Sequence, residues 1–510
     1  MKNYKYLYFL LIATFIGCSD LEEEPVGLLS PDGFFKSPAD IQTAVNGAIG
    51  NMASEAYWGR KLTVSLLLRG DMATIGDQGT SAARKEVNYF QMNDASGMVS
   101  EFWPRSYEVI ASANEAIAGA EFVDAAPENK SPITAQAYFI RAFAYYHLVR
   151  VFGEVPYLDQ PVINVDDTKT ISKTSVADVY THIIADLEEA KTWLPNVQPI
   201  KALPSKATAS AYLASVYLTL GEFKKAYDEA KYVIDNEGLF NLNLEPDFQN
   251  LFDADKQDAL KEPLFVIDFN GFQISNYGMD YMAPITGIRQ NQRLDGRADI
   301  GEGWSVAVPS IEVYNRWDGR DYRKAVSLDT TAVFDGVTQP FSYFPTGDSR
   351  NIASAYIAKY TRFPGVTGGA NGRASSINYA TMRYAEVLLI AAEALNEITP
   401  GTTEADSYIN RIRLRARNKA GVLTSFPEDV TSGLSKDAFR DMVLEERRIE
   451  LAFEFKRWYD IKRRQLGTDV FGPTGLEPQV NFDPSRDYLF PLPGDELQRN
   501  PNLAPNNPGY

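Results

Sequence analysis

The sequence predicts a mainly α-helical protein in which a scaffold of paired helices is interrupted by one long irregular segment. Three observations support this fold class. Apolar residues recur at helical spacing near both ends of the chain, small residues are concentrated in two of these stretches, and residues 239–380 are instead rich in Gly, Asn, Asp and aromatic side chains. We therefore expect helical parts at 37–238 and 381–510, on either side of an irregular excursion at 239–380.

Residues 1–17 are typical of an export signal. Two lysines give a short positive region, and the apolar run 6–16 is too short to span a bilayer. Gly17 then precedes Cys18, the single cysteine of a chain of 510 residues. Lipoprotein processing requires a small residue before the thiol, so we expect Cys18 to become the lipidated N-terminus. The alternative is an ordinary signal peptide with an incidental cysteine nearby.

The composition agrees with an envelope location. One cysteine allows no internal disulfide, so stability must come from a large packed core. The formal charge is −17, and it becomes −19 when Lys2 and Lys5 leave with the signal, which argues against nucleic-acid binding. No other segment reaches about 18 consecutive apolar residues, so only the lipid should hold the chain to a membrane. Residues 18–36, with the acidic run "SDLEEEP", are expected to be a flexible tether.

Helices are predicted in the N-terminal part at 37–54, 102–122 and 131–153. The first and the third begin with a Ser-Pro pair in cap and first-turn positions. The third is apolar on nearly all faces and ends at Gly153. We therefore expect the third helix to be buried.

Two stretches carry the pattern of tightly crossing helix pairs. Residues 204–235 combine small residues, aromatic residues and a turn at Gly221, which is the layout of a tetratricopeptide unit. A related pattern, with a break at Pro400-Gly401, occupies 382–417. Repeats this far apart indicate one helical scaffold interrupted by the excursion. Within the excursion, "PLFVIDF" is a strand-like run. Because loops of this size are usually functional, we expect the excursion to carry a ligand site.

Five sequence blocks together resemble the SusD/RagB family of outer-membrane nutrient-binding lipoproteins. They occur in the family's order within 18–510: "RAFAYYHLVRVFGEVPYL", "RYAEVLLIAAEALNE", "INRIRLRARNKAG", "ERRIELAFEFKRWYDIKRR" and "YLFPLPGDELQRNPNLAPNNPGY". The resemblance implies a helical fold whose tetratricopeptide-like pairs support an irregular, ligand-binding half. It also implies a cell-surface lid on a SusC-like TonB-dependent outer-membrane transporter, which captures a glycan for import. Capture of a peptide or cofactor on the same architecture is the alternative, and a surface scaffold or a hydrolase is a third class.

The chain departs from the family pattern at two places. Phe15 stands where lipoprotein signals usually carry Leu, and Glu454-Phe455-Lys456 stand where many members have Glu, Gly and His before "RW". Neither departure touches the ligand-binding half. The acidic run after Cys18 resembles the family's cell-surface export signal.

Residues for catalysis are scarce. The two histidines, His147 and His182, lie inside helical patterns, which leaves little material for a histidine triad or metal cluster. Paired carboxylates for glycoside hydrolysis remain open, but no stretch selects two of them. The charges of "LEERRIELAFEFKRWYDIKR" (444–463) should pair with one another and brace the scaffold. We therefore expect no enzyme, no catalytic residue, no cofactor and no metal, with a structural Ca²⁺ as an open alternative.

Two regions carry the chemistry of sugar binding. A sugar presents an apolar face on which flat rings stack and a polar rim that Asp, Asn and Arg can bind. The regions are 69–90, preceded by Tyr57-Trp58, and 269–304. The stacking candidates are Trp58, Tyr277, Tyr281 and Trp304, and the polar candidates are Asp71, Asp77, Arg84, Asn276, Asp280, Arg289 and Asn291. Core packing is the alternative for each aromatic residue, and we expect Trp103, Trp193, Trp317 and Trp458 to be structural.

Overall fold

The computed structural model describes residues 31–272, 278–288, 303–334, 336–341, 355–366 and 374–510. Most of this part of the chain is helical and its strands are short, so the predicted fold class is confirmed. Among the described residues, no helix is both long and apolar enough to cross a membrane. Cys18 and most of the predicted tether lie outside the described residues.

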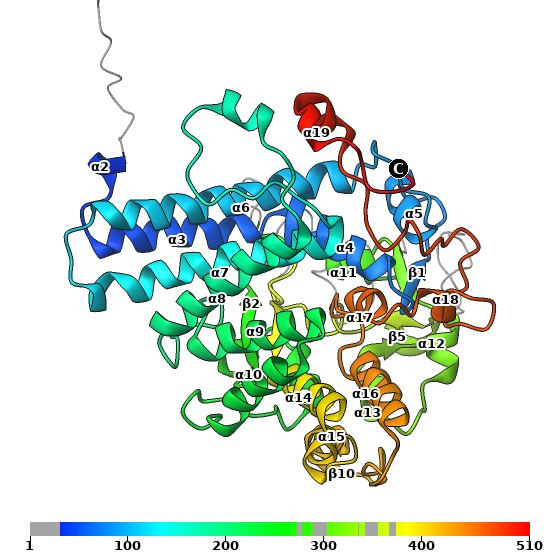
Figure 1. Ribbon diagram of the computed structural model, residues 1–510. Coiled ribbons are helices and arrows are strands. Elements are labelled where there is room, and N and C mark those ends of the chain that lie inside the picture. Colours follow the sequence, from blue (N-terminus) through cyan, green and yellow to red (C-terminus); the bar gives the residue numbers. More distant parts are fainter. Residues whose placement is uncertain (1–30, 273–277, 289–302, 335, 342–354, 367–373) are drawn as a thin grey trace, which may run out of the picture.

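Three long helices form one end of the body (Figure 1). After the short α2 (Pro31–Phe34), the helices α3 (Pro38–Met52), α6 (Val99–Gly119) and α7 (Pro127–Phe152) pack side by side. The predictions at 37–54 and 102–122 are confirmed to within a few residues. A 3₁₀ turn, Ala120–Phe122, extends α6.

The start of α7 differs from the predicted one. The helix begins at Pro127, so the Ser131-Pro132 pair lies inside it rather than at its cap. Proline suits the first helical position, where its missing N–H would have no helical partner, and Pro127 occupies that position. Pro132 costs one internal hydrogen bond, and the helix tolerates it. Almost every residue from Ala135 to Phe152 is buried, which confirms the predicted burial.

The remaining scaffold is a series of packed helix pairs. Each helix contacts the next in the series α7, α8 (Val176–Trp193), α9 (Lys206–Leu220), α10 (Phe223–Asp235), α14 (Tyr384–Ile398) and α15 (Thr403–Ala416). Gly221, with a φ of 75°, makes the left-handed turn between α9 and α10. Because α10 packs directly on α14, the two repeat-like stretches belong to one scaffold, as predicted (Figure 1).

The C-terminal segment packs back on this scaffold. It contains α16 (Lys436–Glu450), α17 (Arg457–Arg463), α18 (Gly467–Val470), α19 (Gly494–Arg499) and a 3₁₀ turn at Pro501–Leu503. α16 lies against α14, and α17 lies against α4 (Lys61–Leu68). A hairpin of β9 (Asn418–Lys419) and β10 (Val422–Leu423) follows α15.

The described elements between 239 and 380 are short. The helices are two 3₁₀ turns (Phe248–Phe252 and Gln257–Ala259), α11 (Met282–Thr286), α12 (Ile311–Arg316) and α13 (Tyr322–Ser327). The strands are β2 (Pro263–Ile267), β3 (Ala307–Pro309), β4 (Leu328–Asp329), β5 (Thr331–Phe334), β6 (Val337–Pro340), β7 (Tyr356–Ile357) and β8 (Tyr379–Arg383). The predicted strand "PLFVIDF" is β2, and it pairs antiparallel with β8. Each described sheet has two strands.

Candidate functional site

The structure brings the two predicted sugar-binding regions together. β1 (Ala73–Ile75), from the first region, pairs antiparallel with β3, which directly follows the second. The contact continues beyond the strands, since the backbone N–H of Asp77 donates to the carbonyl of Ser305 at 2.7 Å. The N–H of Tyr281 donates to the carbonyl of Gly59 at 3.0 Å, which ties the turn before α11 to the segment that carries Trp58.

Two of the four stacking candidates form an aromatic pair at this junction. The rings of Tyr281 and Trp304 have centroids 5.8 Å apart, and their planes are inclined by 35°. Tyr281 is 8% exposed, whereas Trp304 is half-buried and keeps accessible surface. The backbone N–H of Trp304 donates to the carbonyl of Pro284 at 2.6 Å, so a main-chain hydrogen bond fixes the position of the Cα atom that carries the indole ring. Trp304 is therefore the better placed of the two rings to meet a ligand.

Two arginines lie over these rings. The guanidinium carbon of Arg60 is 4.8 Å from the ring centroid of Tyr281, and that of Arg84, in α5 (Ala82–Asn88), is 5.8 Å from that of Trp304. Arg60 forms an ion pair with Glu55 across a single π-helical turn, Glu55–Gly59. Arg60 and Glu55 were not among the predicted site residues, and their nearest sequence signal is their position beside Tyr57-Trp58.

The polar candidates Asp77 and Arg84 lie beside the aromatic pair. A side-chain oxygen of Asp77 accepts the N–H of Gly79 at 2.8 Å, and Arg84 donates to the hydroxyl of Thr80 at 2.9 Å. Burial lowers the pKa of Arg84 to about 10, and repulsion from Arg60 adds to this, while Asp77 and Glu55 oppose it. The junction therefore combines an accessible indole ring with a partly desolvated cation.

Three other candidates are structural, contrary to the prediction. Trp58 is 2% exposed and packs against Phe143 and His147, so its ring has no accessible face. Asp71 is fully buried, and both of its side-chain oxygens accept from Arg457 at 2.8 Å.

Asp280 is fully buried as well. It accepts the N–H of Met282 at 2.6 Å and the hydroxyl of Ser375. Burial raises the pKa of Asp280 to about 7, against the effect of these hydrogen bonds. The fold therefore uses the oxygens of both aspartates in hydrogen bonds and buries the ring of Trp58 in the core. The remaining candidates, Tyr277, Asn276, Arg289 and Asn291, lie outside the described residues.

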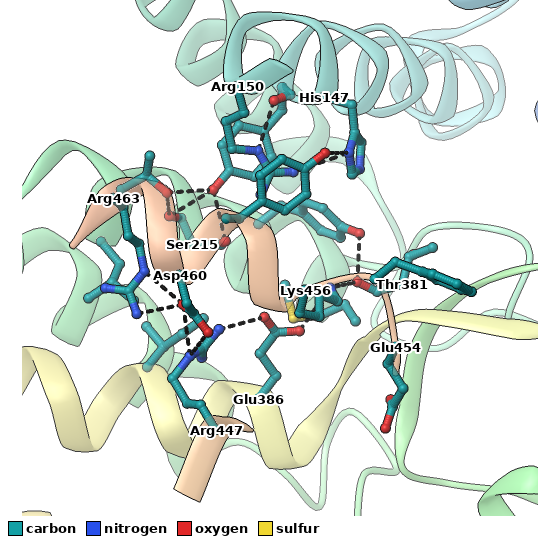
Figure 2. A pocket seen from close by; sticks show the side chains of 18 of the residues that line it. His147, Arg150, Ser215, Thr381, Glu386, Arg447, Glu454, Lys456, Asp460 and Arg463 are labelled. Atoms are coloured by element: carbon teal, nitrogen blue, oxygen red, sulfur yellow. Dashed lines mark hydrogen bonds and ion pairs between the residues drawn. The ribbon is translucent and has the colours of Figure 1, made fainter. Parts of the chain in front are cut away.

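A small cavity lies among α7, α9, α14, α16 and α17 and is lined largely by charged and polar side chains (Figure 2). Its volume of about 30 Å³ leaves room for one or two water molecules, which is too little for a sugar. Arg447 donates to Asp460 at 2.9 Å and to Glu386 at 3.2 Å. The imidazole of His147 hydrogen-bonds the hydroxyl of Tyr459 at 2.8 Å. The interactions inside this cavity join helices to one another, so we interpret it as part of the scaffold.

The charged segment 444–463 forms the ion network that the sequence predicted. Glu450 is fully buried and pairs with Arg323, Arg383 and Arg415. Arg323 comes from α13, Arg383 from the end of β8 and Arg415 from α15. One carboxylate of α16 thus connects elements that are far apart in the sequence.

Family models match both the N-terminal and the C-terminal parts of the chain, and curated relatives match its full length. A family model described as "SusD family" matches residues 313–510, and one described as "Starch-binding associating with outer membrane" matches residues 21–218. The chain is 58% identical to SusD-like protein P2 of Formosa agariphila over 512 aligned residues, with 100% of both chains covered. It is 25% identical to SusD-like protein P25 of the same organism, with 99% of this chain and 98% of the relative covered.

Solved structures show the same fold. A SusD homolog from Bacteroides thetaiotaomicron superposes with a TM-score of 0.81 at 20% identity, with 94% of this chain and 98% of the other covered. A laminarin-binding SusD-like protein gives 0.76 at 22% identity, with 93% and 100% covered. Surface glycan-binding protein A of B. thetaiotaomicron, in complex with laminarihexaose, gives 0.75 at 18% identity, with 92% and 100% covered.

Proposed function

The chain belongs to the SusD family, and from this premise we propose that it is a cell-surface lipoprotein of the outer membrane that captures oligosaccharides or polysaccharides. Lipid on Cys18 would anchor it, and it would cover a SusC-like TonB-dependent transporter and pass its cargo on for import. Its role is binding rather than cleavage. The SusD-like relatives, one of them a laminarin-binding protein, and the family model described as "Starch-binding associating with outer membrane" support this proposal.

One observation carries the glycan-binding part of the proposal. Trp304 is a half-buried indole beside Tyr281, at the junction of two segments that the sequence marks as rich in sugar-binding residue types. Captured cargo must later be released, so a dissociation constant in the millimolar to micromolar range suffices, which corresponds to roughly −4 to −8 kcal/mol. A few ring contacts and hydrogen bonds can supply that free energy.

Affinity electrophoresis tests this assignment. A soluble protein that lacks residues 1–20 is run in native gels that contain a panel of neutral and acidic polysaccharides. Trp304→Ala should weaken retention at least tenfold, about 1.4 kcal/mol, because it removes the stacking surface. The matched control is Trp193→Ala, since Trp193 is 37% exposed at the end of α8, away from the junction.

A second variant, Tyr281→Ala, removes the other ring of the pair, but this ring is buried and its loss can also destabilise the fold. The melting temperature of each variant therefore separates lost binding from lost folding. Unchanged retention of a folded Trp304→Ala protein would show that this ring is not the binding surface. A wild-type protein that is retained by no polysaccharide would contradict glycan capture itself.

The transporter partner has its own test. A lid must dock with a broad surface, and stable interfaces usually bury at least about 1,200 Å² in total. Mild detergent extraction of the full-length lipoprotein should therefore co-purify a large TonB-dependent β-barrel. Repeated isolation of the lipoprotein alone, under conditions that keep other envelope complexes intact, would contradict the lid role.

A further inference from the structure

We propose that the cargo is an acidic glycan, and that Arg84 pairs with a carboxylate or sulfate group on a sugar that contacts Trp304. This inference rests on the proposed function and names its substrate class. It comes from the hydrogen bonds and ion pairs of the Arg84 side chain, which are fewer than those of most buried arginines in the described part of the chain.

Arg84 has hydrogen-bonding capacity to spare. A guanidinium carries five N–H donors, and within the described part of the chain one side-chain hydrogen bond uses them, from Nη1 to the hydroxyl of Thr80 at 2.9 Å. Arg84 forms no ion pair with any described residue. By contrast, Arg323, Arg383 and Arg463 each pair with at least two carboxylates.

The nearby carboxylates are already engaged. Glu55 pairs with Arg60, and Asp77 accepts the backbone N–H of Gly79. Arg60 adds a second positive charge, and its buried Nε has no hydrogen-bond partner among the described residues. Burial and the charge of Arg60 both act against the protonated form of Arg84, which lowers its pKa to about 10. A half-buried cation that forms no direct ion pair is costly, and the nearby carboxylates Asp77 and Glu55 offset this cost only in part. An anionic ligand group within hydrogen-bond distance would lower the cost further.

The geometry suits a sugar that bears such a group. At 5.8 Å from the ring centroid, the guanidinium of Arg84 is near the outer limit of about 6 Å for a cation–π contact. The ring and one neutral hydrogen bond therefore hold it loosely, and it can turn to give a carboxylate or sulfate two parallel hydrogen bonds. A neutral glycan would offer hydroxyl groups alone to the same cation.

The overall charge of the protein makes this inference easy to test. A chain with a formal charge of −17 has no general attraction for polyanions. Binding of an acidic glycan must therefore come from a local cationic site rather than from the field of the whole molecule.

Isothermal titration of the soluble protein that lacks residues 1–20 can isolate the contribution of Arg84. The ligands are fragments of a uronic-acid polysaccharide and of a sulfated polysaccharide, each compared with its own carboxyl-reduced or desulfated form. We expect an intact fragment to bind at least tenfold more tightly than its neutral form, and Arg84→Gln to abolish most of that difference. The pair whose difference disappears identifies the group as carboxylate or sulfate.

The matched control is Arg320→Gln. Arg320 is an exposed arginine that pairs with Asp318 at 2.7 Å and lies over the ring of Phe426. The substitution Arg320→Gln removes the same charge from a surface outside the proposed site, so the affinities of this variant for each fragment should equal those of the wild type.

The outcomes separate this inference from the function on which it rests. Equal affinity for charged and neutral forms, or an Arg84→Gln protein that keeps the full difference, would overturn the acidic-cargo inference. If Trp304→Ala still weakens binding of the neutral forms in that case, the glycan-capture proposal stands. If the wild-type protein binds none of the fragments or their neutral forms, both proposals fail.

Discussion

Replacement of the buried Glu450 by glutamine should destabilise the fold by about 3 kcal/mol. The side chain of Glu450 accepts hydrogen bonds from Arg323 at 3.1 Å, from Arg383 at 3.0 Å and from Arg415. Loss of one partner from a buried ion pair usually costs about 3–5 kcal/mol, because a charge is left uncompensated.

The lower end of this range applies here because each arginine keeps another carboxylate. Asp321 and Glu446 still face Arg323, Glu454 and Glu262 still face Arg383, and Glu262 still faces Arg415. A glutamine keeps the shape of the side chain, so the measured loss reports on charge rather than on a cavity.

Urea-induced unfolding measures the difference, and α16 supplies a matched control. Glu445 lies on the same helix, its side chain is 53% exposed, and it pairs with Arg448, so Glu445→Gln should cost about 0–1 kcal/mol. The pH dependence gives an independent check. Burial alone would raise the pKa of Glu450, but the charges of Arg415, Arg383 and Arg323 outweigh it and lower the pKa. The stabilisation is therefore complete above the unfolded pKa of about 4.3 and is lost as the pH falls through the folded pKa.

The difference between wild type and Glu450→Gln should accordingly shrink in acid. A Glu450→Gln protein as stable as Glu445→Gln at pH 7 would refute the view that this carboxylate joins the scaffold.

Three further predictions concern the core, the excursion and the anchor. Trp458 is fully buried beside Tyr488, Phe90 and Arg69, so Trp458→Ala should cost about 3–5 kcal/mol in unfolding free energy while the folded fraction still binds glycan; lost affinity at full stability would contradict this. Burial raises the pKa of Asp280 to about 7, so the folded state binds more protons than the unfolded state between about pH 4 and 7 and stability falls as the pH rises through that window. Asp280→Asn should flatten this decline in thermal melts, and an unchanged pH profile would count against it. Cys18→Ser should abolish labelling by a fatty-acid probe in cells, and undiminished labelling would exclude Cys18 as the lipidated residue.

The scaffold could be predicted from the sequence because its signals are local. The spacing of small and aromatic residues around Gly221 specifies α9, α10 and the turn between them without any knowledge of partners. The helical pattern around His182 is α8, whose buried residues Val179, Ile183 and Leu187 lie four apart on one face. The start of α7 was misplaced because two proline signals five residues apart compete, and the earlier one, Pro127, begins the helix.

The candidate site was harder to predict because its residues are selected by distant partners. Asp71 and Asp77 are six positions apart and both are buried, but Asp71 pairs with Arg457, 386 positions later, whereas Asp77 accepts the nearby N–H of Gly79 beside the aromatic pair. Arg60 joins the site through Tyr281. No local pattern reports either contact. The residue types were enough to predict both sugar-binding regions. Which side chains in them remain accessible to a ligand depends on long-range packing, which the local sequence does not show.

Backbone pairing outside the candidate site sets the position of Trp304. β2 and β8, near the two ends of the excursion, pair with each other, while β3 pairs with β1 from the N-terminal part. Between these anchors, Ser305 donates its N–H to the carbonyl of Gly287 at 2.8 Å, and Val306 donates to that of Ile285 at 2.9 Å. The backbone around the indole is therefore fixed by hydrogen bonds that involve no ligand-facing side chain. If the proposed site is correct, we therefore expect substitutions at Trp304 and Arg84 to change glycan affinity at little cost in stability. We expect substitutions at Glu450 and Trp458 to change stability with little effect on affinity.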